Sequence, residues 1–204
     1  MKSNSPALAL ACYGCGVETI ERLSSPPLAR RLGDAVHVSP LLRNIRRMSG
    51  CSEDRVGEWL LQCAVQRGAS HYDRDFPEDL PPDDPDLSDE ELAVALCLGR
   101  HPYNPTFIRA AAQLLSSPST DAPKLARLAV MERVEPVLFH IATLAARFAP
   151  EMQPWAYLLR HLPQRLACPP EALPHWSRFV SQTGVTSFAG GPDIKWLQRR
   201  EPAK

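Results

Sequence analysis

The chain of 204 residues is long enough for one domain or for two small ones. Apolar residues make up 44% of it and charged residues 23%, as in globular proteins that bury a core. The 23 Lys and Arg balance the 23 Asp and Glu, which excludes a uniformly basic nucleic-acid-binding protein but not a local basic patch. The 21 prolines favour many short helices, because proline interrupts a helix interior.

The sequence contains no run of the ~20 apolar residues that cross a bilayer, so we expect no membrane association. The apolar run Pro6–Ala11, followed by Cys12, resembles the start of a lipoprotein signal but is shorter than an export signal requires. Six cysteines are too few for a disulfide scaffold in a chain of this length. We therefore expect a cytoplasmic protein with reduced thiols.

Charge is distributed unevenly along the chain. Residues 1–73 carry nine basic against seven acidic side chains, residues 74–91 carry one against nine, and residues 92–204 carry thirteen against seven. The acidic segment also holds four prolines, and like charges and prolines together keep a segment extended. We interpret residues 74–91 as a linker or a long surface loop, which follows an N-terminal helical segment (1–73).

Five amphipathic helices are predicted between residues 88 and 165, the helical core. Ser88 and Glu91 fit a capping box, in which each of the two side chains accepts a hydrogen bond from the backbone N–H of the other residue. The connections are short, so consecutive helices should be antiparallel. The prediction is an all-α fold, either a compact bundle or a short stack of helical hairpins with an extended C-terminal tail. The starts of the five helices are marked by Ser88, Asn104, Asp121, Pro136 and Trp155.

Residues 41–68 predict two further helices with a tight break between them. Ser39 and Pro40 begin the first helix, Gly50 ends it, Ser52 caps the second and Gly68 ends that one. Two helices joined by a short break resemble a helix-turn-helix.

The first helix of this hairpin has a basic face formed by Arg43, Arg46 and Arg47. In a DNA-binding hairpin, however, it is the second helix that enters the groove. Here the second helix begins with acidic residues, which repel phosphate. The hairpin is therefore either an ordinary one with solvated arginines or a surface for nucleic acid or an acidic partner.

The segment 166–204 is rich in proline and glycine and should be mostly non-helical. Residues Phe179–Phe188 could pair as a hairpin around Thr183 and Gly184, with extended chain from Gly190. Tryptophan and arginine are enriched among interface hot spots, so we expect the tail to bind a protein partner. The alternative is that its tryptophan folds back onto its own helices. The candidate partner-binding residues are Ile194, Trp196, Leu197, Arg199 and Arg200.

Cys12 and Cys15 have the spacing of half a zinc site or of a redox pair. A second Cys-x-x-Cys is absent and no strand–helix pattern surrounds the pair, so they are weak zinc candidates and we predict no metal site. The six histidines show no ligand spacing, and the sequence holds no phosphate loop and no nucleophile elbow. We therefore predict no catalytic residue and no cofactor.

These observations favour a non-catalytic protein–protein interaction or scaffold protein, as a small subunit of a larger assembly. The alternative is a nucleic-acid-binding regulator or subunit that uses the hairpin at 41–68 and the basic C-terminal half. An enzyme whose site assembles only in the folded chain is the third class.

Overall fold

The computed structural model describes residues 39–69, 75–98, 104–163, 173–183 and 193–200. The chain divides into two compact units, residues 1–38 and residues 39–204, and all of the described residues belong to the second.

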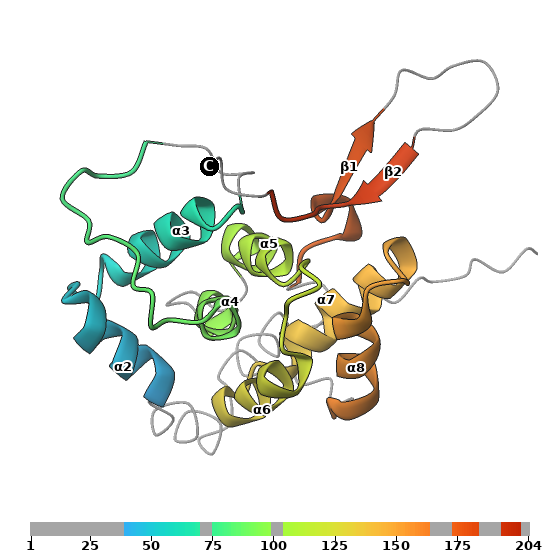
Figure 1. Ribbon diagram of the computed structural model, residues 1–204, viewed down its shortest axis with the longest axis horizontal. Helices are drawn as coiled ribbons and strands as arrows, with labels where there is room; N and C mark the ends of the chain where they lie inside the picture. Colours follow the sequence, from blue (N-terminus) through green and yellow to red (C-terminus); the bar gives the residue numbers. More distant parts are fainter. Residues whose placement is uncertain (1–38, 70–74, 99–103, 164–172, 184–192, 201–204) are drawn as a thin grey trace, which may run out of the picture. The chain divides into compact units, whose positions relative to one another are not determined.

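The second unit is a compact all-α bundle, which confirms the predicted fold class (Figure 1). A pair of short strands and a turn of 3-10 helix follow the last α-helix. The described elements are α2 (Pro40–Ser49), α3 (Val56–Gln66), α4 (Asp89–Leu98), α5 (Pro105–Leu114), α6 (Ala122–Glu132), α7 (Glu135–Phe148), α8 (Gln153–His161), η5 (Trp176–Arg178), β1 (Val180–Thr183) and β2 (Asp193–Trp196).

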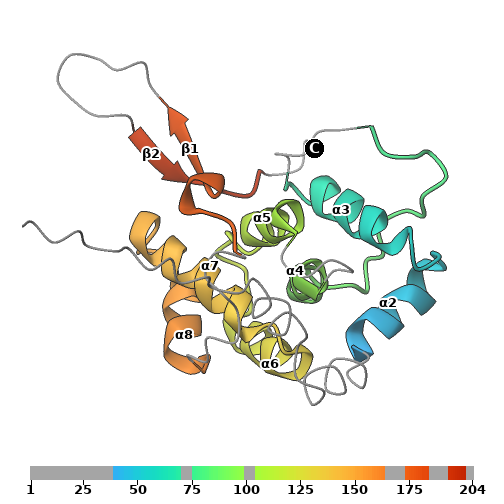
Figure 2. The same cartoon turned by 180° about the vertical axis from the view of Figure 1, so that it is seen from behind.

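Helix α4 lies at the centre of the bundle, with α2, α3, α5 and α6 packed around it (Figure 1). Its residues Leu92–Cys97 are apolar on every side of the helix, and all of them are buried. A helix that is apolar all round is stable in water only when neighbours cover each face. Helix α8 packs against α6 and α7 on the side of the bundle away from α2 (Figure 2).

Most predicted helix starts are confirmed by the caps. The Ser88 N–H donates to the Glu91 carboxylate at 3.0 Å, and the Glu91 N–H donates to Ser88 Oγ at 3.3 Å, which completes the capping box. Three more predicted starts have a side-chain cap: Ser39 accepts from the Leu42 N–H, Asn104 from the Thr106 N–H, and Asp121 from the Lys124 N–H.

The predicted cap at Ser52 is wrong. Helix α3 begins at Val56, and Arg55 before it makes no side-chain cap. It is the backbone carbonyl of Ser52 that accepts hydrogen bonds, from the N–H groups of Arg55 and Val56. The chain thus tightens into a turn before the helix, so the break between α2 and α3 is longer than the sequence predicts.

A buried carboxylate from a distant helix caps α2. Glu132, at the end of α6, is 2% exposed, and its Oε1 accepts from the Leu41 N–H at 3.0 Å. Carboxylates are stabilised at a helix N-terminus because several backbone N–H groups there lack partners. This bond attaches the start of α2 to the end of α6.

The acidic segment packs against α3. Trp59 of α3 donates its indole N–H to the carbonyls of Pro81 and Pro82, at 3.1 and 3.2 Å. Within the segment itself, the side chains of Leu80 and Leu87 are buried against the core. Residues 75–88 therefore follow the surface of the bundle.

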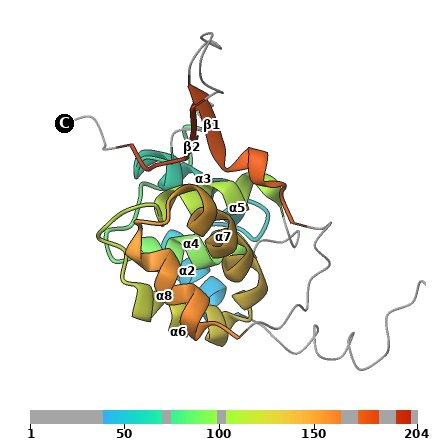
Figure 3. The ribbon, with the colours of Figure 1, turned by 90° about the vertical axis from the view of Figure 1, so that its right-hand side faces the viewer.

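The strand pairing differs from the predicted hairpin. Strand β1 pairs antiparallel with β2, with Val180 opposite Trp196, so the partner of 180–183 is 193–196 and not 185–188. The pairing follows burial, because Val180 and Trp196 both enter the core at the base of the pair. Figure 3 shows the two strands at the end of the bundle that lies away from α6.

Truncation of Ile141 tests the core. Its side chain is fully buried on α7, so Ile141→Ala should lower the free energy of unfolding by about 2–5 kcal/mol. Leu144, on the same helix, is half-buried, and Leu144→Ala should cost about 1–2 kcal/mol. Urea unfolding followed by circular dichroism measures both. If both variants lost the same free energy of unfolding, the result would contradict the burial of Ile141 and the partial exposure of Leu144 on α7.

The capping box predicts a pH dependence. Burial raises the pKa of Glu91, but its bonds to Ser88 and the Lys124 ammonium outweigh burial, and the net pKa is lowered. The charged form therefore stabilises the fold above the ordinary value of 4.5, and this contribution is lost as the pH falls through the lowered pKa. Glu91→Gln should cost about 0.5–1 kcal/mol at pH 7 and nothing below the transition. Urea titrations at several pH values measure this difference, and a constant difference would contradict it.

Candidate functional site

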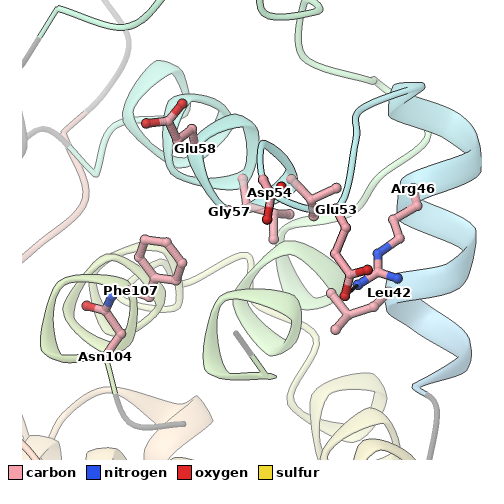
Figure 4. A pocket seen from close by; sticks show the side chains of 10 residues that line it. Leu42, Arg46, Glu53, Asp54, Gly57, Glu58, Asn104 and Phe107 are labelled. Atoms are coloured by element: carbon pink, nitrogen blue, oxygen red, sulfur yellow. Dashed lines mark hydrogen bonds and ion pairs between the residues drawn. The ribbon is translucent and has the colours of Figure 1, made fainter. Parts of the chain in front are cut away.

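A groove of about 310 Å³ opens between α2, α3 and α5 (Figure 4). Helix α2 contributes Leu42 and Arg46, and the start of α5 contributes Asn104 and Phe107. The other lining residues come from α3 and the turn before it: Glu53, Asp54, Val56, Gly57, Glu58 and Leu60. We call this the acidic groove.

The apolar part of the groove depends on a close approach of two helices. Gly57 of α3 faces the Phe107 ring of α5, and a Cβ at Gly57 would lie 3.2 Å from it. A glycine inside a helix costs about 0.5–1 kcal/mol relative to alanine, and here it allows the ring to sit against the α3 backbone. The half-buried side chains of Leu42 and Phe107 thereby stay within reach of the groove.

The charge of the groove is negative. Three carboxylates line it, from Glu53, Asp54 and Glu58, against the single guanidinium of Arg46, a formal balance of −2. Arg46 Nη2 lies 3.1 Å from Glu53 Oε1, so this ion pair bridges α2 and the turn before α3 (Figure 4). The groove thus combines an apolar floor with excess negative charge.

The predicted basic face of α2 is divided by this ion pair. Arg43 and Arg47 are exposed, and Arg47 donates to Asn44 in its own helix at 3.5 Å, whereas Arg46 turns towards Glu53. The second helix of the hairpin, α3, buries its apolar face against α4 and α5. The three arginines therefore do not form one continuous cationic surface with α3.

The candidate anchor in the tail is part of the core. Trp196 is 3% exposed and stacks on Phe179 at a centroid distance of 5.5 Å, and its indole N–H donates to Ser116 Oγ at 2.7 Å. Leu197 is also buried, and Ile194 is partly buried against the same core. Burial of the indole and satisfaction of its N–H favour the alternative expectation, in which the tryptophan folds back onto its own helices.

The tail arginines hold the end of the chain to α3. Arg199 donates from Nε to the Arg67 carbonyl at 2.6 Å and forms an ion pair with Asp89. The Arg200 N–H donates to the Gly68 carbonyl at 3.1 Å. Gly68 has φ +102°, and a Cβ there would lie 2.0 Å from the Arg200 carbonyl oxygen, so only glycine fits.

A metal site finds no support among the residues that the structure describes. No group of three His, Cys, Asp or Glu there could hold a metal ion, and the zinc candidates Cys12 and Cys15 lie outside the described residues. Burial raises the pKa of the Cys97 thiol to about 12, and burial together with Asp83 raises the pKa of Cys63. Both are therefore inert core thiols at neutral pH.

Comparisons of the chain with protein-family models, with curated proteins and with solved structures find no match. Within the described ranges, no helix has both the length and the apolar character needed to cross a membrane.

Sequence reasoning missed the acidic groove. In the sequence, Glu53, Asp54 and Glu58 are the acidic residues at the start of the second helix, and there they indicate only a repulsion of phosphate. Nothing in the sequence places Phe107 beside them. The signal that the sequence does carry is Gly57 inside an apolar helical stripe, because such a glycine often marks a close approach of another element.

Replacement of Arg67 tests the ion pair with Asp83 that holds the acidic segment against α3; we call this pair the Arg67 clamp. The Arg67 side chain is 12% exposed and forms a bidentate pair with Asp83 at 2.6 Å. Arg67→Ala should cost about 2–3 kcal/mol, less than for a fully buried pair because Asp83 retains some solvent. Urea unfolding measures the loss.

The matched control is Arg55, which forms the same bidentate geometry with Asp79 at 2.6 Å on the exposed surface. Arg55→Ala should leave the free energy of unfolding almost unchanged, because solvent screens exposed pairs. If Arg55→Ala lowered the free energy of unfolding as much as Arg67→Ala does, burial would not be the reason why the Arg67–Asp83 pair stabilises the fold.

Proposed function

We propose that this protein is a non-catalytic protein-interaction module whose acidic groove binds a short segment of a partner protein that carries a basic residue beside a large apolar one. The observation that carries the proposal is the groove between α2, α3 and α5, which joins an apolar floor to three carboxylates. Apolar pockets with a few convergent polar groups are the usual form of binding sites.

The size of the groove sets the size of the occupant. A volume of about 310 Å³ is at the lower end of the ~300–1,000 Å³ that hold a drug-sized ligand. It accommodates one or two side chains of a partner and not a whole helix face. An aliphatic or aromatic side chain would lie against Leu42 and Phe107, while a Lys or Arg next to it would approach Glu58 and Asp54.

Charge favours a protein segment over a nucleic acid at this site. Phosphates would meet three carboxylates, and the guanidinium that lines the groove, that of Arg46, is already paired with Glu53. Opposite charges across an interface increase the association rate and select the partner. The alternative function, nucleic-acid recognition by the hairpin at 41–68, stays a prediction that this groove does not support.

Membership of a larger cytoplasmic assembly belongs to the same proposal. Cys51, Cys63 and Cys97 are all unpaired thiols, which suits a reducing compartment. A single small pocket gives a modest affinity by itself, and a scaffold subunit gains avidity from further contacts in its assembly.

Peptide display on the full chain tests the groove. Selection from a random peptide library should enrich sequences with Lys or Arg within a few residues of Leu, Phe or Trp. The enriched peptides should bind with micromolar affinity, and Glu58→Lys should weaken them about tenfold, measured by fluorescence anisotropy of the labelled peptides.

Asp86→Lys is the control, because it makes the same change of charge at an exposed acidic residue outside the groove. It should leave peptide affinity within about twofold of the wild type. The proposal fails if selection enriches no basic–apolar pattern, or if Glu58→Lys and Asp86→Lys weaken binding equally.

A further inference from the structure

A second surface lies at the other end of α5, where the end of α7 meets η5. Phe148, the last residue of α7, stacks on Trp176 of η5 with a centroid distance of 5.5 Å and an interplanar angle of 26°. The Arg147 guanidinium carbon lies 5.2 Å from the Phe148 ring centre and 5.9 Å from that of Trp176. We call these three residues the aromatic–arginine cluster.

The aromatic rings of the cluster are half-buried and Arg147 is exposed. Cation–π contacts at exposed positions are weak, so this arrangement leaves the guanidinium able to exchange partners. Trp176 is the one described tryptophan that is not buried, since Trp59, Trp155 and Trp196 lie in the core. Tryptophan with arginine at a surface is typical of interfaces.

A hollow of about 580 Å³ adjoins the cluster and shares Phe148 with it. Its lining residues come from α5, the turn after α7, the two strands, and the tail that follows β2. Besides Phe148, its lining includes the amide side chain of Gln198 and the hydroxyl of Ser181, whereas the buried Gln113 donates its amide N–H to the Gln198 carbonyl. Such groups can donate to and accept from the edge of a planar heterocycle.

Charge at this surface is opposite to that of the acidic groove. Lys195 and Arg200 line the hollow, and Glu151 is the one acidic residue among the lining residues. Two further exposed guanidinium groups belong to the same elements as the rings. Arg147 precedes Phe148 in α7, and Arg178 lies two residues after Trp176 in η5. The surface therefore joins flat aromatic rings to an excess of cations.

We propose that the aromatic–arginine cluster and the adjoining hollow bind single-stranded nucleic acid. Bases would stack against Phe148 and Trp176, while Arg147, Lys195 and Arg200 would contact the phosphates. Proteins that bind single strands combine stacking aromatic side chains with a cationic path for the backbone, and both features are present here. A duplex hides its bases within the stack and offers the rings nothing to contact.

An acidic peptide matches the cations but not the rings. Its carboxylates would pair with Arg147 and Lys195, yet it has no regular array of flat groups for Phe148 and Trp176. Stacking on an aromatic side chain is worth about five- to 150-fold in affinity per base. The aromatic residues therefore distinguish the two classes of partner.

The test uses the full chain and a fluorescein-labelled thymidine oligonucleotide of about twelve nucleotides, followed by anisotropy at a series of salt concentrations. We expect a Kd of about 1–100 µM at low salt, which weakens as salt rises. Arg147→Ala and Lys195→Ala should each weaken binding about three- to tenfold and lower the salt slope by about 0.7. Trp176→Ala should weaken binding at least about fivefold.

Arg127→Ala is the matched control, because Arg127 is an exposed arginine on α6, away from this surface. It should change neither affinity nor salt slope. Circular dichroism of each variant checks the fold, and the Arg147 and Lys195 variants keep the test decisive if Trp176→Ala unfolds.

Four results would overturn the proposal. The first is no anisotropy change at low salt, and the second is a loss of affinity in Arg127→Ala equal to that in Arg147→Ala. The third is binding of the matching duplex at least as tight as that of the single strand, and the fourth is displacement of the oligonucleotide by poly-glutamate at equal charge concentration. The last result would assign the surface to an acidic protein. Because Glu58 lies in the acidic groove, Glu58→Lys should not abolish oligonucleotide binding, so the two proposals fail independently.

Discussion

The guanidinium of Arg67 joins the parts of this fold that the helices alone do not connect. Its Nε and Nη2 bind the two oxygens of Asp83 at 2.6 Å, and Nη1 binds the Leu87 carbonyl at 2.6 Å and Asp89 at 3.1 Å. The Arg67 carbonyl accepts from Arg199. One residue at the end of α3 therefore holds the acidic segment and the start of α4 through its side chain, and the C-terminal tail through its backbone carbonyl.

This clamp explains how a segment with a large negative charge lies along the bundle. Its like charges would otherwise repel each other and favour an extended, solvated chain. Burial lowers the pKa of the Arg67 guanidinium, but Asp83 and Asp89 outweigh burial and the net pKa is raised, so the cation persists at any physiological pH. Asp89 also receives Arg199, which couples the position of the tail to that of the acidic segment.

Surfaces of opposite charge lie at the two ends of α5, a negative one at its start and a positive one at its end. Asn104 and Phe107 at its start line the acidic groove, and Gln113 near its end lines the hollow beside the aromatic–arginine cluster. A helix of ten residues is about 15 Å long, so the two surfaces are separated by little more than one helix. Such a chain, neutral in total, can offer an anionic site to one partner and a cationic site to another.

The sequence alone predicts the helices, because their signals are local: a capping side chain such as Ser88 or Asp121 binds a backbone N–H three residues on. It did not determine partners across long separations. Glu132 binds the N–H of Leu41, and Trp196 binds Ser116, only because the packed helices bring them together. Residue type shows that a tryptophan or an arginine needs a partner, but not which one. Only the packing of the helices therefore places Trp196 in the core and brings Leu42, Glu58 and Phe107 to one groove.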